Sequence, residues 1–217
     1  MPRPRFARLE LQRRRQILER AAEEFASHGY QHASLNHIIE ALGLNKGVFY
    51  YYFDGKADLF AAVMRMAWET TVPADAMDVG RLSAETFWPS LQRLLQENHR
   101  QMRERPWFAG ILRMLLDAPH AAGLDAVIAD QLSQAHLWVK GLLRRGQEVG
   151  AVRTDLPEDL LLEVLTGADQ AADRWLLANW DRLTPEERQE AGLRTIDLWR
   201  RIANPPPASD APEAKPS

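Results

Sequence analysis

Residues 34–56 read SLNHIIEALGLNKGVFYYYFDGK, and this stretch decides the fold of the N-terminal part of the chain. Its first half predicts a short helix with an apolar face, capped by the hydroxyl of Ser34. Gly43 permits the positive φ that a sharp exit from a helix needs, and Asn45 caps a second helix over residues 46–52. Two short helices joined by a turn of about three or four residues predict a helix-turn-helix.

The second of these helices has two chemically different faces. Phe49 and Phe53 are four residues apart, so both side chains are expected in the core. The other positions carry small, basic or hydroxyl-bearing groups that suit a major groove and its flanking phosphates: Lys46, Gly47, Tyr50, Tyr51, Tyr52 and, at the start of the next helix, Lys56. Each residue alone also fits an ordinary cap or core position, and it is their order that indicates DNA binding.

The block from Arg14 to Val63 resembles the N-terminal domain of the TetR family of transcriptional regulators. The matching positions are Ile17, Ala21, Phe25, Gly29, Tyr30, Ser34, Ile38, Gly43, Gly47, Tyr50, Phe53, Lys56 and Leu59. The rest of the chain matches only in being helical and of suitable length. The resemblance implies an all-α protein that binds double-stranded operator DNA as a homodimer and responds to a small molecule.

The resemblance also implies roles for single residues. Positions that usually contact phosphate are occupied by Ser34, Tyr50, Tyr52 and Lys56. Positions that usually face bases are occupied by Asn36, Lys46, Gly47 and Tyr51. The chain departs from the family pattern at Val48, where a small or hydroxyl residue is common, and at Asn45, where serine is frequent. These departures leave the preferred operator sequence open.

Charge is unevenly distributed over the 217 residues, whose net charge is −3. The first twenty residues hold seven arginines against two glutamates, which predicts a flexible basic arm over residues 1–8 that contacts phosphate or serves as a solubilising tail. The chain has no cysteine, which excludes thiolate metal sites and disulfides and fits the cytoplasm. Neither a signal peptide nor a membrane-spanning stretch is visible.

Helical periodicity continues to the end of the folded region, and no segment alternates as a strand does. We predict an all-α fold of about nine helices: a helix-turn-helix domain over 9–55 and a helical ligand-binding and dimerisation domain over 56–203. Gly29 ends the first helix, and Pro89 either begins or kinks the helix that contains it. Residues 204–217 are rich in proline and predict a disordered tail.

The central helices carry many aromatic and methionine side chains, which can line a pocket between helices. Each of them also fits a plain core position. The predicted cavity, for a small hydrophobic effector that is uncharged or weakly anionic, is bounded by Met64, Trp68, Trp88, Met102, Trp107, Phe108 and Trp138.

Small side chains in the 164–176 segment predict a close contact between helices of two copies. Together with the last helix they would form a two-fold, four-helix interface. The residues assigned to it are Ala168, Ala172, Trp175, Ile196 and Trp199.

No catalytic or nucleotide-binding motif is present, and the histidines do not form a site, so no enzyme activity, cofactor or metal is predicted. The sequence predicts a DNA-binding transcriptional regulator that acts as a ligand-responsive repressor. Two alternatives stay open: a ligand-independent DNA-binding adaptor or architectural protein, and an α-helical enzyme.

Overall fold

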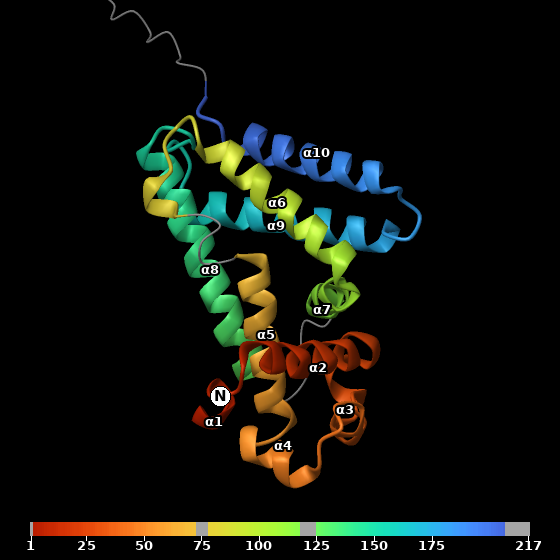
Figure 1. Ribbon diagram of the computed structural model, residues 1–217. Coiled ribbons are helices and arrows are strands. Elements are labelled where there is room, and N and C mark those ends of the chain that lie inside the picture. The colour runs from red at the N-terminus through yellow and green to blue at the C-terminus, as the bar shows by residue number, and fades with distance from the viewer. Residues whose placement is uncertain (1, 73–77, 118–124, 207–217) are drawn as a thin grey trace, which may run out of the picture.

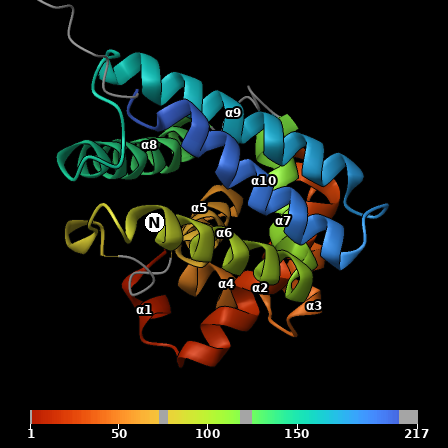
Figure 2. The ribbon, with the colours of Figure 1, turned by 90° about the horizontal axis from the view of Figure 1, so that it is seen from above.

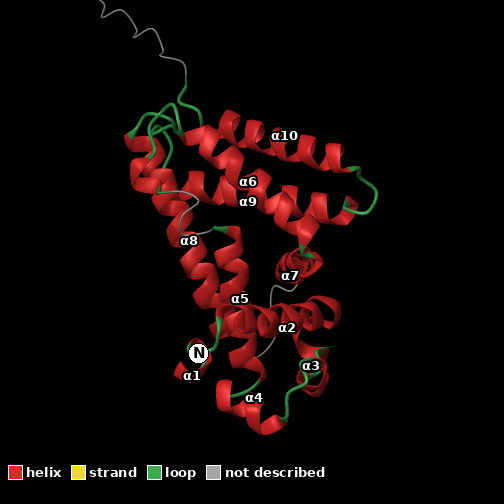
Figure 3. Cartoon of the chain, in the orientation of Figure 1, coloured by secondary structure: helices red, strands yellow, loops and turns green. Residues whose placement is uncertain are grey.

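The computed structural model describes residues 2–72, 78–117 and 125–206. Over these residues the chain forms ten α-helices and one short 3-10 helix and contains no strand (Figures 1 and 3). The predicted all-α class is confirmed. The α-helices are α1 Pro4–Ala7, α2 Leu11–His32, α3 Leu35–Ala41, α4 Lys46–Tyr52, α5 Lys56–Thr71, α6 Phe87–Glu104, α7 Pro106–Asp117, α8 Asp125–Glu148, α9 Glu158–Asn179 and α10 Pro185–Ala203, and the 3-10 helix is η1 Val79–Arg81.

Helix boundaries follow the glycine, proline and capping residues. Gly29 has φ +68° and kinks α2 before its last residues. Pro89 lies in the first turn of α6, where a missing N–H costs nothing, so α6 begins there and is not kinked. Thr184 and Glu187 form a reciprocal capping box at the start of α10.

The basic arm is packed against the helix-turn-helix, which corrects the prediction of a flexible segment. Residues 4–7 form α1, and Phe6 is only 6 % exposed because its ring packs against Phe53, at 4.7 Å between centroids. The Arg3 N–H donates to the Tyr52 carbonyl at 2.9 Å, and its guanidinium pairs with Asp54 at 2.6 Å. The prediction of flexibility rested on the arginines of this arm, whereas Phe6, its aromatic residue, determines how the arm packs.

One hydrophobic core joins the helix-turn-helix to the helices that follow it. Phe25, Phe49 and Phe53 belong to the same buried cluster as Phe60 and Ile111, from α5 and α7. The core therefore does not divide at residue 55, where the sequence places the domain boundary.

Helix α7 crosses α2 at very short range. A Cβ atom added to Gly110 would lie 2.5 Å from the Cβ of Ala26, so only glycine fits at this position. Figure 1 shows α7 lying between the lower helices α2–α4 and the upper helices α6, α9 and α10. This crossing therefore connects the two ends of the molecule.

A second buried cluster holds the upper helices together. It contains residues from α6, α8, α9 and α10, including Phe87, Leu142, Leu161 and Ile196. Seen from above, α6, α9 and α10 lie beside one another (Figure 2). No helix among the described residues is long and apolar enough to cross a membrane. The tail predicted to be disordered lies outside the described residues from 207 onward.

Replacing Gly110 by alanine tests the α2–α7 crossing. Alanine favours a helix interior over glycine by about 1 kcal/mol, but here its methyl group collides with Ala26. We expect the free energy of unfolding, measured in urea, to fall by about 1–3 kcal/mol.

The matched control is Gly141→Ala on α8, where an added Cβ meets nothing within 4 Å. This variant should be as stable as the parent protein or slightly more so. Equal stability of the two variants would contradict the close packing of α7 on α2.

Candidate nucleic-acid interface and pocket

The two short helices α3 and α4 form the predicted helix-turn-helix. The Ser34 Oγ accepts a hydrogen bond from the His37 N–H at 3.2 Å, and the Asn45 Oδ1 accepts one from the Val48 N–H at 2.9 Å. Gly43 has φ +64° and turns the chain between the two helices. Both predicted caps and the predicted turn glycine are confirmed.

A buried carboxylate fastens α3 to α2. Glu24 is 8 % exposed; its Oε1 accepts from the Ser34 N–H at 2.9 Å, and its Oε2 lies 2.7 Å from the His37 Nδ1. Burial alone would raise the pKa of Glu24, but these hydrogen bonds, with the nearby His28, hold it below its ordinary value of 4.5. The role of Glu24 could not be predicted from the sequence because its hydrogen-bond partners on α3, Ser34 and His37, lie ten and thirteen residues away.

The outer face of α4 is open to solvent at the lower end of the molecule (Figure 1). Lys46 and Gly47 are exposed, and Tyr50 and Tyr51 each retain 47 % exposure, while Phe49 is buried at 1 %. The apolar back of the helix is therefore in the core, and the residues predicted to face bases or phosphate share the exposed side. Asn36, the remaining residue predicted to face bases, is exposed on α3.

Two residues predicted to contact phosphate already have partners inside the chain. Tyr52 is half-buried, with its ring 6.1 Å from that of Phe6. The Lys56 Nζ donates to the Gln31 carbonyl at 3.0 Å and lies 4.9 Å from the centroid of the Tyr30 ring. Burial lowers the pKa of Lys56, while the negative charge of Glu24 acts in the opposite direction. Their contact with phosphate stays a prediction.

The residues predicted to bound a ligand cavity are divided between the two cores. The core that includes Phe25 contains the buried Met64, Met102, Trp107 and Phe108. Trp88 is instead buried in the second core, that of the upper helices. Trp88 and Met102 are fourteen residues apart on α6, a distance of about 20 Å along a helix. The half-buried rings of Trp68 and Trp138 pack edge to face, with 6.2 Å between their centroids. The prediction of one cavity bounded by these side chains is therefore corrected.

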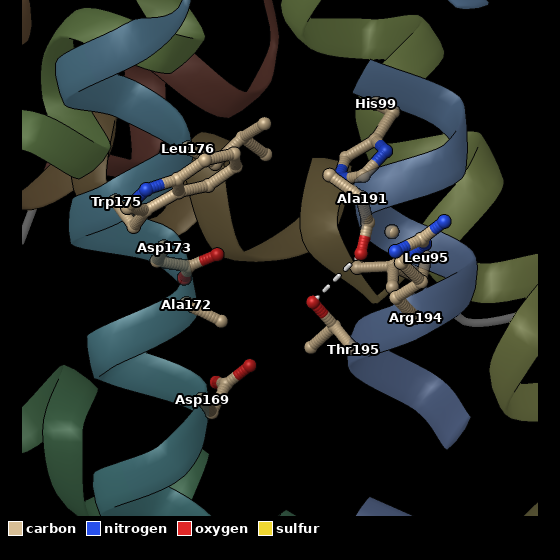
Figure 4. A pocket seen from close by; sticks show the side chains of 11 residues that line it. Leu95, His99, Asp169, Ala172, Asp173, Trp175, Leu176, Ala191, Arg194 and Thr195 are labelled. Atoms are coloured by element: carbon tan, nitrogen blue, oxygen red, sulfur yellow. Dashed lines mark hydrogen bonds between the residues drawn. The ribbon is translucent and has the colours of Figure 1, made fainter. Parts of the chain in front are cut away.

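A cavity of about 300 Å³ lies instead between α6, α9 and α10 (Figure 4). None of the seven residues predicted for a ligand lines it. The lining residues are Leu95, His99, Asp169, Ala172, Asp173, Trp175, Leu176, Ala191, Gly192, Arg194 and Thr195. The prediction was based on the abundance of aromatic side chains. The cavity forms instead where small residues of α9 and α10 leave space between the helices.

Three titratable groups in the cavity are perturbed by burial. Burial and the neighbouring Asp173 raise the pKa of Asp169 to about 7, and burial raises the pKa of Asp173 to about 6. His99 is 7 % exposed, and burial, with Arg103 nearby, lowers its pKa. Near neutral pH the imidazole is therefore uncharged and the aspartates are close to their titration range.

The residues predicted for a dimer interface do not share one surface. Ile196 is 5 % exposed in the chain's own upper core, against which the half-buried Trp199 packs, so neither is available as expected. Ala168 and Ala172 are half-buried, and Trp175 is 54 % exposed. The large apolar side chains exposed on α9 and α10 are Leu160, Val164, Trp175 and Leu198.

Comparison with known proteins supports the reading of the lower helices. Residues 17–63 match the family model described as bacterial regulatory proteins, tetR family. The chain is similar to the transcriptional repressor AcnR of Corynebacterium efficiens, with 31 % identity over 68 % of this chain and 73 % of that protein. It is 28 % identical to AcnR of Corynebacterium diphtheriae over 69 % and 73 % of the respective chains.

The fold is also similar to that of a solved structure. The transcriptional regulator FadR of Bacillus subtilis, in complex with stearoyl-CoA, matches 85 % of this chain and 96 % of its own with a TM-score of 0.70. Sequence identity is 17 %, so this likeness shows the fold alone.

Replacing Glu24 by glutamine tests the clamp between α2 and α3. The loss of charge should lower the free energy of unfolding by about 1 kcal/mol at pH 7. Because the folded carboxyl has the lower pKa, its contribution is complete above 4.5 and is lost as the pH falls through the folded pKa. The difference from the parent protein should therefore shrink from pH 6 to pH 3.

The control is Glu23→Gln, an exposed neighbour on the same helix that forms an ion pair with Arg20. Its effect should be within a few tenths of a kcal/mol, as for other exposed pairs. Urea titrations of both variants at several pH values give the comparison, and a pH-independent loss in Glu24→Gln would contradict the proposed ionic clamp.

Proposed function

The chain belongs to the TetR family of bacterial transcriptional regulators, and on that premise we propose that it is a ligand-responsive repressor that binds an inverted-repeat operator as a homodimer. The observation that carries this proposal is the exposed face of α4, with Lys46, Gly47, Tyr50 and Tyr51 on one side of a firmly capped helix. AcnR of two corynebacteria, to which the chain is similar, is named as a repressor.

In the proposed complex α4 lies in the major groove. Lys46 and Gly47 are at its N-terminus, the end from which a recognition helix contacts base edges. A Cβ on Gly47 would also lie only 3.2 Å from the capping Asn45 Oδ1, so glycine favours both the cap and a close approach to DNA. Tyr50 and Lys56 supply donors for phosphate.

The proposed dimer surface is the apolar stripe of α9. Leu160 and Val164 are 50 % and 43 % exposed, and their spacing of four residues places them on one face of the helix. Exposed Gly167 and Ala171 follow them on that face and permit two helices to approach closely. A second copy of the chain is the proposed partner, and its two-fold symmetry requires a symmetric operator.

Helix α7 offers a path from the upper helices to the DNA-binding helices. It follows directly after α6, and its Arg113 guanidinium donates to the Leu177 carbonyl of α9 at 3.0 Å. At Gly110 it is in contact with α2. A ligand that shifts α6 or α9 would therefore tilt α2 and change the spacing of the two recognition helices, a coupling of about 1–3 kcal/mol.

Two other functions make different predictions. An adaptor or architectural protein with the same DNA-binding helices would bind DNA with an affinity that no small molecule alters. An α-helical enzyme would need convergent catalytic groups, and the cavity among the described residues holds two aspartates and a histidine without a nucleophile–base pair. The upper cavity favours the ligand-responsive repressor.

Two lysine variants test the docking of α4 on DNA, using a gel shift with the intergenic DNA upstream of the protein's own gene. Lys56→Ala should weaken binding to every sequence and lower the slope of log affinity against log salt by about one, because one phosphate contact is lost. Lys46→Ala should change which operator variants are preferred.

Arg81→Ala is the control, since this 89 % exposed cation lies on η1, away from α3 and α4. It should leave both quantities unchanged. Unchanged affinity of the Lys56→Ala protein at several salt concentrations would show that the docking is wrong.

Val164→Glu tests the dimer surface. A carboxylate buried against an apolar partner without a counterion costs several kcal/mol, so sedimentation should show monomer and the operator should no longer be bound tightly. Gln170→Glu adds the same charge at an exposed position of α9 away from Leu160 and Val164, and should remain a dimer. If both variants sediment as dimers, the interface lies elsewhere.

A further inference from the structure

Helix α9 carries a pair of aspartates on the face opposite its exposed apolar stripe. Asp169 and Asp173 are one helical turn apart and both line the upper cavity, and Figure 4 shows their side chains directed from α9 toward α10. Among the described residues neither carboxylate has a hydrogen bond or an ion pair. The cavity therefore contains negative charge without a matching cation.

The other polar groups of the cavity leave this imbalance in place. Arg194 is the basic residue of the lining, but its guanidinium pairs with Glu190 at 2.8 Å and is 79 % exposed. His99, from α6, is 7 % exposed and forms no hydrogen bond with any described residue. Its ring reaches the cavity because Gly192 has no side chain; a Cβ there would lie 2.4 Å from the His99 Cε1.

The cavity is otherwise apolar. Leu95, Leu176, Ala172 and Ala191 form its walls, and Trp175 lies beside the aspartates (Figure 4). Half-buried carboxylates without a counterion are stabilised by a cation, and an aromatic ring attracts a cation to its face. The described residues contain no group of three acidic, histidine or cysteine side chains arranged for a metal ion, so an organic cation fits this lining better than an inorganic one.

We propose that the cavity between α6, α9 and α10 binds a small organic cation, whose ammonium group lies between Asp169 and Asp173 and whose apolar part contacts Leu95, Trp175 and Leu176. The volume of about 300 Å³ suits a compound with a single ring. His99 provides one neutral hydrogen-bonding group in the lining. This inference rests on the proposed function in one respect only: it makes the cation the effector that α6 and α7 report to the DNA-binding helices.

The test is calorimetric titration of the full-length protein with benzyltrimethylammonium, whose charge does not depend on pH. We expect saturable binding at pH 8 that weakens at least tenfold in the Asp169→Asn, Asp173→Asn double variant. Binding should also be weaker at pH 5.5, because carboxylates with pKa values of about 7 and 6 are then protonated. Asp181→Asn, an exposed aspartate just beyond α9, should bind as the parent does.

Several results would overturn the inference. They are absence of binding at pH 8, binding that the double variant leaves intact, or equally tight binding of the anion 3-phenylpropionate. If the double variant does not fold, Trp175→Leu replaces it, and this variant must lose affinity for the quaternary ammonium compound.

A gel shift with upstream DNA separates this inference from the proposed function. A protein that binds its operator but not the cation would leave the repressor proposal standing and remove the cation site. A protein that binds the cation but no DNA would support the cation site and contradict the repressor proposal.

Discussion

The structure depends on the crossing of α7 over α2, where Gly110 lies against Ala26. This contact is too close for any larger residue at Gly110, and Ala26 packs against the buried cluster that contains Phe25, Phe49 and Phe60. Because protein cores are close-packed, α2 cannot slide past α7 without opening that cluster. The recognition helix α4 is therefore packed rigidly against the rest of the chain. Its orientation depends on the position of α7, which is in turn fixed by its contacts with α6 and α9.

Helix α9 serves the upper half of the molecule in two ways. Its outward face carries Leu160 and Val164 for the proposed dimer, and its inward face carries Asp169 and Asp173 in the cavity. A ligand that changes the inward packing therefore acts on the helix that would set the distance between two copies. Regulation of this kind needs only a rigid-body shift of packed helices, and no element has to unfold.

Local signals made the helix-turn-helix predictable from the sequence. The caps at Ser34 and Asn45 and the turn at Gly43 each depend on neighbours within a few residues. The Glu24 clamp, the packed arm and the cavity depend on contacts between distant segments, which single-sequence periodicity does not report. The tryptophan and methionine content of the central helices correctly indicated side chains that pack in a core. It could not indicate which of the two cores each side chain would join. The half-buried Asp169 and Asp173 gave no local signal, since a charged residue on a helix normally faces water.

The central claim is that occupation of the upper cavity moves the recognition helices through α7. The chain contains no cysteine, so Ser27→Cys, exposed on α2, gives a single spin label per copy. Electron-electron resonance then measures the distance between the two labels in the dimer. The account predicts one distance with operator DNA, a different one when benzyltrimethylammonium is bound, and loss of that shift in the Asp169→Asn, Asp173→Asn variant. The same distance with DNA and with saturating cation would contradict it.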